Sequence, residues 1–163
     1  MRIRPVPQRI RLRALALLLW GLGRLLRRAA RVDPLIHAEL APLPVGFCLQ
    51  LGCLGLTRPL ILHKQAQGWS TAPATATLRL TFKHPDVALR VLGFRLGINA
   101  SFCEGRLSTE GDLVAAMHWV RALEALQAVL LPPRFARPLL RDYRRPPRQL
   151  RRALTILAGL LLP

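Results

Sequence analysis

Apolar and polar residues alternate with a period of two between positions 76 and 83. Leu78, Leu80 and Phe82 share one side of this segment, and charged or hydroxyl-bearing side chains occupy the other. This alternation is typical of a β-strand with one buried face. Other segments rich in strand-forming residues predict further strands at residues 45–54, 60–64 and 105–109.

Apolar residues recur at helical spacing elsewhere and predict helices at residues 9–32, 87–96 and 112–131. Asp112 stands at the start of the third helix and is its candidate N-cap. The first helix combines a broad stripe of leucines with a narrow edge of arginines. That pattern fits a helix lying in a membrane interface, and it fits equally a helix that packs on the domain and exposes its arginines to water.

Proline and glycine separate these elements. Pro34, Pro42 and Pro44 predict a linker, and the glycine, serine and proline content of residues 65–75 predicts a loop. Strands interrupted by short helices indicate the α+β class, with a small, mostly antiparallel sheet covered by helices. The final apolar run, residues 153–162, is too short to cross a membrane and suits an interfacial helix.

Charge divides the chain into three parts. The formal net charge is +17, with nine arginines and no acidic residue in residues 1–32 and eight arginines with one aspartate in residues 134–163. We therefore expect a basic amphipathic helical arm at residues 1–33, a nearly neutral folded domain at 34–133, and a basic and apolar helical tail at 134–163. A chain this basic is expected to bind a polyanionic partner.

Residue types that carry catalysis or bind metals occur here without a recognisable spacing. The histidines share no metal-ligand spacing, the cysteines form no paired motif, and the sequence has no glycine-rich phosphate loop or serine nucleophile motif. We predict no catalytic residue, no metal and no cofactor, and free thiols at Cys48, Cys53 and Cys103. The sequence thus favours a binding protein over an enzyme.

One stretch joins an alternating strand, a short helix, a second strand and a Gly-Asp pair that opens a long helix. Its defining residues are Phe102, Gly105, Arg106, Leu107, Gly111, Asp112, Leu113, Ala116 and Met117. In these features residues 76–131 resemble the sterol carrier protein type 2 family. The resemblance implies a five-stranded α+β fold whose helices enclose an apolar tunnel. The layout is also similar to a bacterial branch of that family, which holds polyprenylated intermediates as an accessory factor in ubiquinone biosynthesis.

A tunnel of this kind would hold an acyl or prenyl chain, with each buried methylene contributing about 0.8 kcal/mol. Its expected lining residues are Leu78, Leu80, Phe82, Leu92, Phe102, Leu107, Leu113, Met117 and Val120. The basic ends are expected to hold the tunnel near an anionic membrane. The expected membrane contacts are Arg13, Arg24, Arg27, Arg28, Arg31, Arg148, Arg151 and Arg152.

The expected function is non-catalytic binding of a lipid, or of a polyprenyl or quinone precursor, at a membrane surface, with biosynthetic enzymes as candidate partners. A nucleic-acid-binding basic module and a helical adaptor of a protein complex are the alternatives, although the basic ends offer few aromatic side chains for base stacking. We expect a cytoplasmic protein peripheral to the inner membrane. The apolar run at residues 14–23 leaves a secretion signal or an organelle-targeting segment as alternatives.

Overall fold

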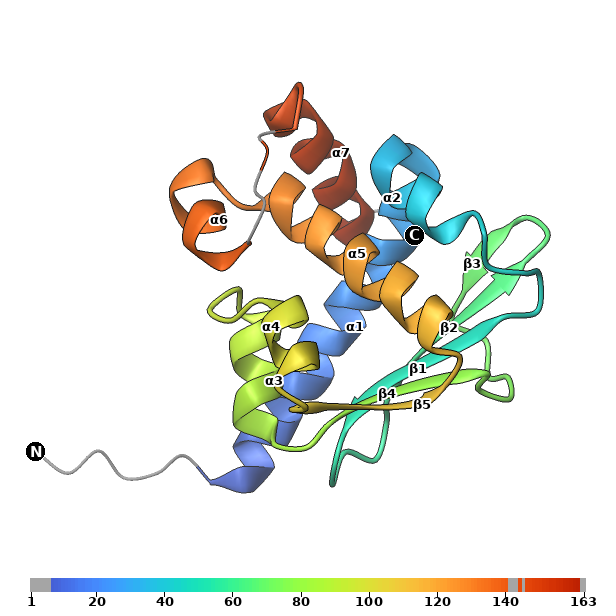
Figure 1. Cartoon of the computed structure of the whole chain (residues 1–163), viewed down its shortest axis with the longest axis vertical. Coiled ribbons are helices and arrows are strands. Elements are labelled where there is room, and N and C mark those ends of the chain that lie inside the picture. The colour runs from blue at the N-terminus through green and yellow to red at the C-terminus, as the bar shows by residue number, and fades with distance from the viewer. Residues whose placement is uncertain (1–6, 141–143, 145, 162–163) are drawn as a thin grey trace, which may run out of the picture.

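The sheet has five strands in the spatial order β3-β2-β1-β4-β5 (Figure 1). The computed structural model describes residues 7–140, 144 and 146–161. The strands are β1 (Cys48–Cys53), β2 (Leu60–Gln65), β3 (Gly68–Ser70), β4 (Leu78–Phe82) and β5 (Leu107–Gly111). β1 and β4 run parallel, and the other neighbouring strands are antiparallel. The predicted α+β class with a mostly antiparallel sheet is confirmed.

One face of this sheet is apolar because the register aligns leucines from neighbouring strands. Leu49 and Leu51 of β1 lie opposite Leu78 and Leu80 of β4, and Leu51 also lies opposite Leu60 of β2. All five side chains are buried. The intervening positions of β4 are exposed or half-buried, so the period of two marks a strand with one buried face, as predicted.

Helices cover the apolar face and also pack on one another. They are α1 (Gln8–Val32), α2 (Pro34–Leu40), α3 (Pro85–Leu92), α4 (Ile98–Cys103), α5 (Leu113–Leu130), α6 (Pro133–Leu139) and α7 (Gln149–Leu161). α1 contacts β2 and β3, and α5 contacts β4 and β5. Figure 1 shows α1 and α5 crossing beside the sheet, with α7 against the C-terminal half of α1.

Both basic ends of the chain contribute to the hydrophobic core. Leu15, Leu19 and Leu26 of α1 and Ile156 of α7 are at most 2% exposed and belong to the same apolar cluster as the sheet residues. α1 therefore packs on the domain, which is one of the two interpretations that its pattern allowed. One core includes residues from all three segments expected from the charge distribution.

Two elements lie where the sequence predicted connections. α2 occupies the predicted linker because Asp33 Oδ1 accepts hydrogen bonds from the N–H groups of Leu35 (3.0 Å) and Ile36 (3.2 Å), and because Pro34 fills the first turn, where proline is tolerated. β3 pairs with β2 within the predicted loop at residues 65–75. The linker and loop predictions were wrong at these positions.

Gly111 and Asp112 form the corner between β5 and α5. Gly111 has a φ of +118°, and a Cβ at this position would collide with the carbonyl oxygen of Thr77. Asp112 Oδ1 accepts a hydrogen bond from the N–H of Val114 at 2.9 Å, which confirms the predicted N-cap. The corner therefore needs glycine first and a capping side chain second, in the order that the sequence provides.

α5 is long and apolar enough to cross a membrane by length and composition, and half of its 18-residue apolar window is buried inside the structure. Its largest buried side chain is Trp119, whose ring meets that of Trp69 edge-on with centroids 5.1 Å apart. Such burial is the property of a core helix.

Candidate functional site

The side chains expected to line a tunnel fall into two groups. Leu78, Leu80, Phe82, Leu107 and Val120 are at most 4% exposed and pack in the core on the helix-covered face of the sheet. The remaining four are less buried: Leu92, Phe102, Leu113 and Met117. The structure thus brings the first group together as packed core.

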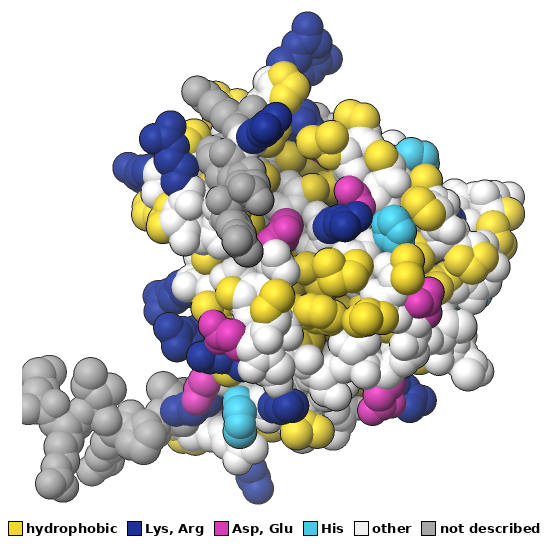
Figure 2. Space-filling view, viewed as in Figure 1, with side chains coloured by type: hydrophobic (Ala, Val, Ile, Leu, Met, Phe, Trp, Pro, Cys, Tyr) yellow, Lys and Arg dark blue, Asp and Glu magenta, His cyan; other side chains and the backbone are white. Residues whose placement is uncertain are grey.

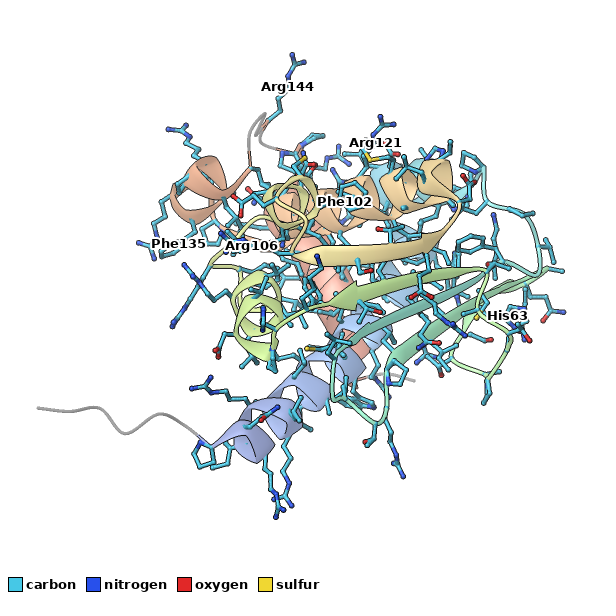
Figure 3. All side chains as sticks on the ribbon, turned by 60° about the horizontal axis from the view of Figure 1, so that its bottom comes forward. His63, Phe102, Arg106, Arg121, Phe135 and Arg144 are labelled. Atoms are coloured by element: carbon cyan, nitrogen blue, oxygen red, sulfur yellow. The ribbon has the colours of Figure 1, made fainter. Side chains whose placement is uncertain are left out.

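The less buried group is dispersed. Leu113 is 60% exposed on the first turn of α5, because the buried side of this helix begins only at Ala115. Phe102 lies on α4 and packs against the edge of the core (Figure 3). Leu92, at the end of α3, lines an apolar cleft that the sequence did not predict.

This cleft, which we call the leucine cleft, lies among α1, α3, α4, α5 and α7 and has a volume of about 210 Å³. Its lining consists of Leu17, Leu18, Gly21, Leu22, Leu25, Val91, Leu92, Phe94, Ile98, Leu123, Leu126, Gln127 and Leu160. Leu17 and Leu18 are 71% and 40% exposed, so the cleft opens to the surface along α1. An apolar recess that reaches the surface can accept a hydrocarbon chain from outside.

Gln127 is the polar side chain in this apolar lining. The residue is 5% exposed, and its Oε1 is buried without a hydrogen-bond partner in the described part of the chain. A buried amide oxygen without a hydrogen-bond donor is costly, and native proteins usually supply one. A hydroxyl group can both donate and accept a hydrogen bond, so it would satisfy either orientation of the amide.

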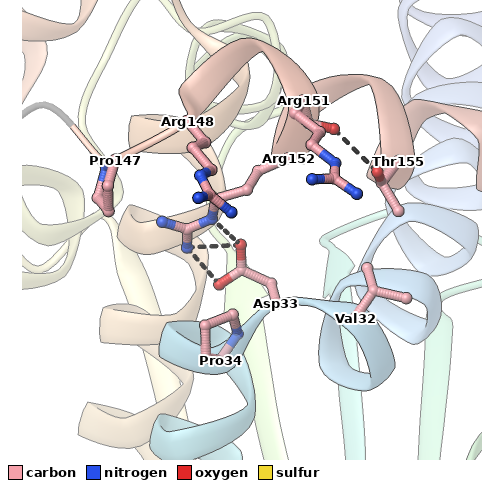
Figure 4. Close-up of a pocket in the computed structure, with 8 residues that line it drawn as sticks. All are labelled: Val32, Asp33, Pro34, Pro147, Arg148, Arg151, Arg152 and Thr155. Carbon is pink, nitrogen blue, oxygen red and sulfur yellow. Dashed lines mark hydrogen bonds and ion pairs between the residues drawn. The ribbon is translucent and has the colours of Figure 1, made fainter.

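Not all of the arginines expected to contact a membrane are exposed. Arg152 donates from Nε to Oδ2 of Asp33 (2.7 Å) and from Nη2 to Oδ1 (2.6 Å), and the Asp33 side chain is 1% exposed (Figure 4). This ion pair ties α7 to the junction of α1 and α2. Arg148 and Arg151 line the same pocket of about 470 Å³ and remain exposed.

The arginines of α1 also differ in exposure. Arg13 and Arg31 are exposed, whereas Arg24, Arg27 and Arg28 are half-buried. Arg24 donates to the carbonyl oxygen of Gly159 in α7 at 3.3 Å. The charged edge predicted for this helix is therefore partly covered by α7.

The titratable groups give no sign of a metal site in the described residues, where no three His, Cys, Asp or Glu side chains come together. All three cysteines are free thiols, with Cys103 exposed. Burial raises the pKa of the Cys48 and Cys53 thiols, and a backbone hydrogen bond at Leu54 offsets part of this rise for Cys53. These two buried thiols are accordingly held in the unreactive, protonated form.

Comparisons with known proteins identify the fold. No family model and no curated protein matches the chain. Among solved structures, it is similar to a protein described as a UbiJ-SCP2 ubiquinone synthesis protein, with a TM-score of 0.50 and 17% identity over 68% of this chain and 96% of that one. It is also similar to sterol carrier protein 2 like 2 from Aedes aegypti, with a TM-score of 0.42 and 16% identity over 70% and 97%. The first likeness confirms the sterol-carrier-like fold that the sequence predicted.

Proposed function

We propose that this chain, which has the sterol-carrier-like fold, binds a hydrophobic lipid in the leucine cleft, without catalysis, at the surface of an anionic membrane. A polyprenyl chain or a quinone precursor is the favoured ligand, in keeping with the ubiquinone synthesis protein whose fold it shares. The observation that carries the proposal is the cleft itself, an apolar recess on the surface with a single buried amide.

The size of the cleft sets how much of a ligand it encloses. An apolar cavity of about 150 Å³ is enough to bind benzene, and the leucine cleft measures about 210 Å³. One or two isoprene units therefore fit inside, and the rest of a longer chain would lie along the exposed Leu17 and Leu18. Each buried methylene contributes about 0.8 kcal/mol.

Gln127 provides a test of this ligand class. We expect the protein to bind farnesol about tenfold more tightly than farnesene, because only the alcohol satisfies the buried amide. In the variant Gln127→Leu the amide is gone, so both compounds should bind with similar affinity. Competition against a fluorescent fatty acid measures all of these affinities.

Two results of that experiment have different meanings. Equal binding of both compounds to the unsubstituted protein contradicts the role of Gln127 and leaves the cleft as a binding site. Failure of either compound to bind contradicts lipid binding in the cleft altogether.

The outer face of α7 supports the membrane part of the proposal. Leu150, Leu154 and Leu157 project from α7 with exposures of 76%, 67% and 40%, next to the exposed Arg148 and Arg151. In Figure 2, several dark blue side chains lie at the end of the molecule formed by α6 and α7. Exposed leucines beside arginines are typical of a helix that rests on an anionic bilayer.

We predict that the protein co-sediments with vesicles containing anionic lipid at physiological salt, and that Leu154→Glu lowers the bound fraction at least about fivefold. The glutamate would place a charge among the acyl chains and offset a neighbouring arginine. The control Val45→Glu changes an equally exposed apolar residue in the loop before β1 and should bind as the unsubstituted protein does.

Equal binding of the two glutamate variants would show that α7 does not touch the membrane. A shift of RNA in a gel without vesicle binding would favour the nucleic-acid-binding alternative, and retention by one protein complex without extractable lipid would favour the adaptor. The proposed location is the cytoplasmic side of the inner membrane, where biosynthetic enzymes are the partners that would receive the lipid.

A further inference from the structure

A second groove lies on the opposite side of α1 from the leucine cleft and is lined by positively charged residues. This arginine groove is lined by Arg24, Arg27 and Arg58 together with the apolar side chains of Trp20, Pro59 and Leu60, and has a volume of about 320 Å³. No acidic residue of the described chain lines it. It also shares no lining residue with the leucine cleft, so it is a separate site.

Arg27 contributes an unsatisfied hydrogen-bond donor to the groove. Its Nε is buried and has no hydrogen-bond partner in the part of the chain that the structure describes. A buried cationic N–H without an acceptor is unfavourable, and an anion in the groove would supply that acceptor. Arg58 approaches from the turn between β1 and β2, where it is exposed.

Trp20 adds an apolar wall beside these charges. It is 60% exposed, and the guanidinium of Arg24 stacks on its ring at 5.3 Å from the centroid. Leu60 and Pro59 form the facing side. The groove therefore combines hydrogen-bond donors for an anion with an apolar surface that a bare inorganic ion would leave uncovered.

We propose that the arginine groove binds the phosphate group of an amphiphile, with the apolar chain of that molecule lying against Trp20 and Leu60. Guanidinium groups bind phosphate oxygens through pairs of parallel hydrogen bonds, and Arg27 and Arg58 provide such donors here. The ligand class is a phosphate monoester or diphosphate bearing a hydrocarbon chain. This site goes beyond the lipid cleft of the proposed function and does not depend on it.

Binding of dihexanoyl phosphatidic acid, a phosphate ester that is soluble as a monomer, tests the proposal. We expect it to bind more tightly than dihexanoyl phosphatidylcholine and to change the fluorescence of Trp20, since Trp69 and Trp119 are buried. Arg27→Gln and Arg58→Gln should each weaken binding about tenfold or more, as expected for loss of a hydrogen bond to a charged group. Arg90→Gln on α3 removes the same charge from an exposed position and should change the affinity by less than about twofold.

The outcomes separate a groove from a general effect of positive charge. If Arg27→Gln and Arg58→Gln bind as Arg90→Gln does, or if both lipids bind equally, the proposal is overturned. Inorganic phosphate that binds as tightly as the lipid overturns the amphiphile part. Binding only to phosphatidic acid in vesicles, with the same dependence on Arg27 and Arg58, identifies a bilayer headgroup as the source.

Arg58 keeps the test informative if Arg27→Gln folds poorly, because Arg58 is an exposed turn residue. The variant Gly21→Leu, which fills the leucine cleft, should retain phosphate binding. A loss of lipid from the cleft therefore leaves this proposal standing, and a loss of phosphate binding leaves the cleft unaffected.

Discussion

The substitution Gly21→Leu is expected to lower the lipid that copurifies with the protein at least about tenfold while the protein stays folded. Gly21 lines the leucine cleft, and a Cβ built there would have Leu160 Cδ2 at 3.9 Å as its nearest neighbour, which is an ordinary contact. A leucine side chain would extend into a space of only about 210 Å³ and occupy the volume of a ligand chain. Native mass spectrometry and lipid extraction measure the bound lipid.

The control is Gly21→Ala, which adds one methyl group and leaves most of the cleft volume available to a lipid chain. Because alanine favours a helix interior over glycine by about 1 kcal/mol, both variants gain helix propensity, and Gly21→Ala should raise Tm by about 2–4 °C. Lipid should remain bound to the alanine variant. If Gly21→Leu carries as much lipid as the unsubstituted protein, the ligand lies elsewhere and the cleft is not its site.

The elements that the sequence predicted well are those whose signals are local. β4 has an uninterrupted period of two, and α5 has both a capping aspartate and a continuous apolar face. Its buried side differs from the predicted one at Leu113, because the first turn of a helix extends beyond the core that covers the rest. Propensity and periodicity do not contain that information, since it depends on where the neighbouring elements end.

α2 and β3 were missed for a different reason. Pro34, together with Pro42 and Pro44, predicts a linker, yet proline in the first helical turn lacks only an N–H that has no partner there in any case. β3 has three residues and carries too little pattern to distinguish it from a loop. Asp33 directly before Pro34 is the signal that could have identified α2, as an N-cap followed by proline.

The sequence does not predict the leucine cleft, because residues from five helices, α1, α3, α4, α5 and α7, line it. Leu22 and Leu160 are separated by most of the chain and line the same cleft only because α7 packs along α1. The leucines of α1 nevertheless cover more of the helix surface than one buried face requires. The additional leucines are the ones that line the cleft. Expected tunnel residues on β4 instead fill the core, because every buried strand face in a small domain has the same apolar signature.

The arginines illustrate the same limit for charge. The sequence placed Arg152 at a membrane because it lies in a basic, apolar tail. The structure pairs it with Asp33, 119 positions away along the chain, and that contact depends on the antiparallel packing of α7 on α1. Net charge of a segment predicts its partners only for side chains that tertiary structure leaves in solvent.

This pairing leads to the largest stability effect that we expect. Arg152→Ala removes the guanidinium from a carboxylate that is 1% exposed and leaves the charge of Asp33 without an ionic partner. The N–H groups of Leu35 and Ile36 would still bind its Oδ1, but Oδ2 would lose its hydrogen bond at 2.7 Å. Breaking a buried ion pair from one side typically costs about 3–5 kcal/mol.

Urea unfolding followed by circular dichroism measures this cost. We expect a lower urea concentration at the midpoint and an unchanged dependence of the free energy of unfolding on urea concentration. Arg151→Ala is the matched control, because it removes the neighbouring guanidinium from an exposed position and should change the free energy of unfolding by less than about 0.5 kcal/mol. A loss for Arg152→Ala no larger than for Arg151→Ala would show that the pair contributes nothing to stability. With a total stability of about 5–15 kcal/mol in a domain of this kind, the expected loss is a large fraction of the total. It falls on the contact that holds α7, the helix whose Leu160 lines the leucine cleft.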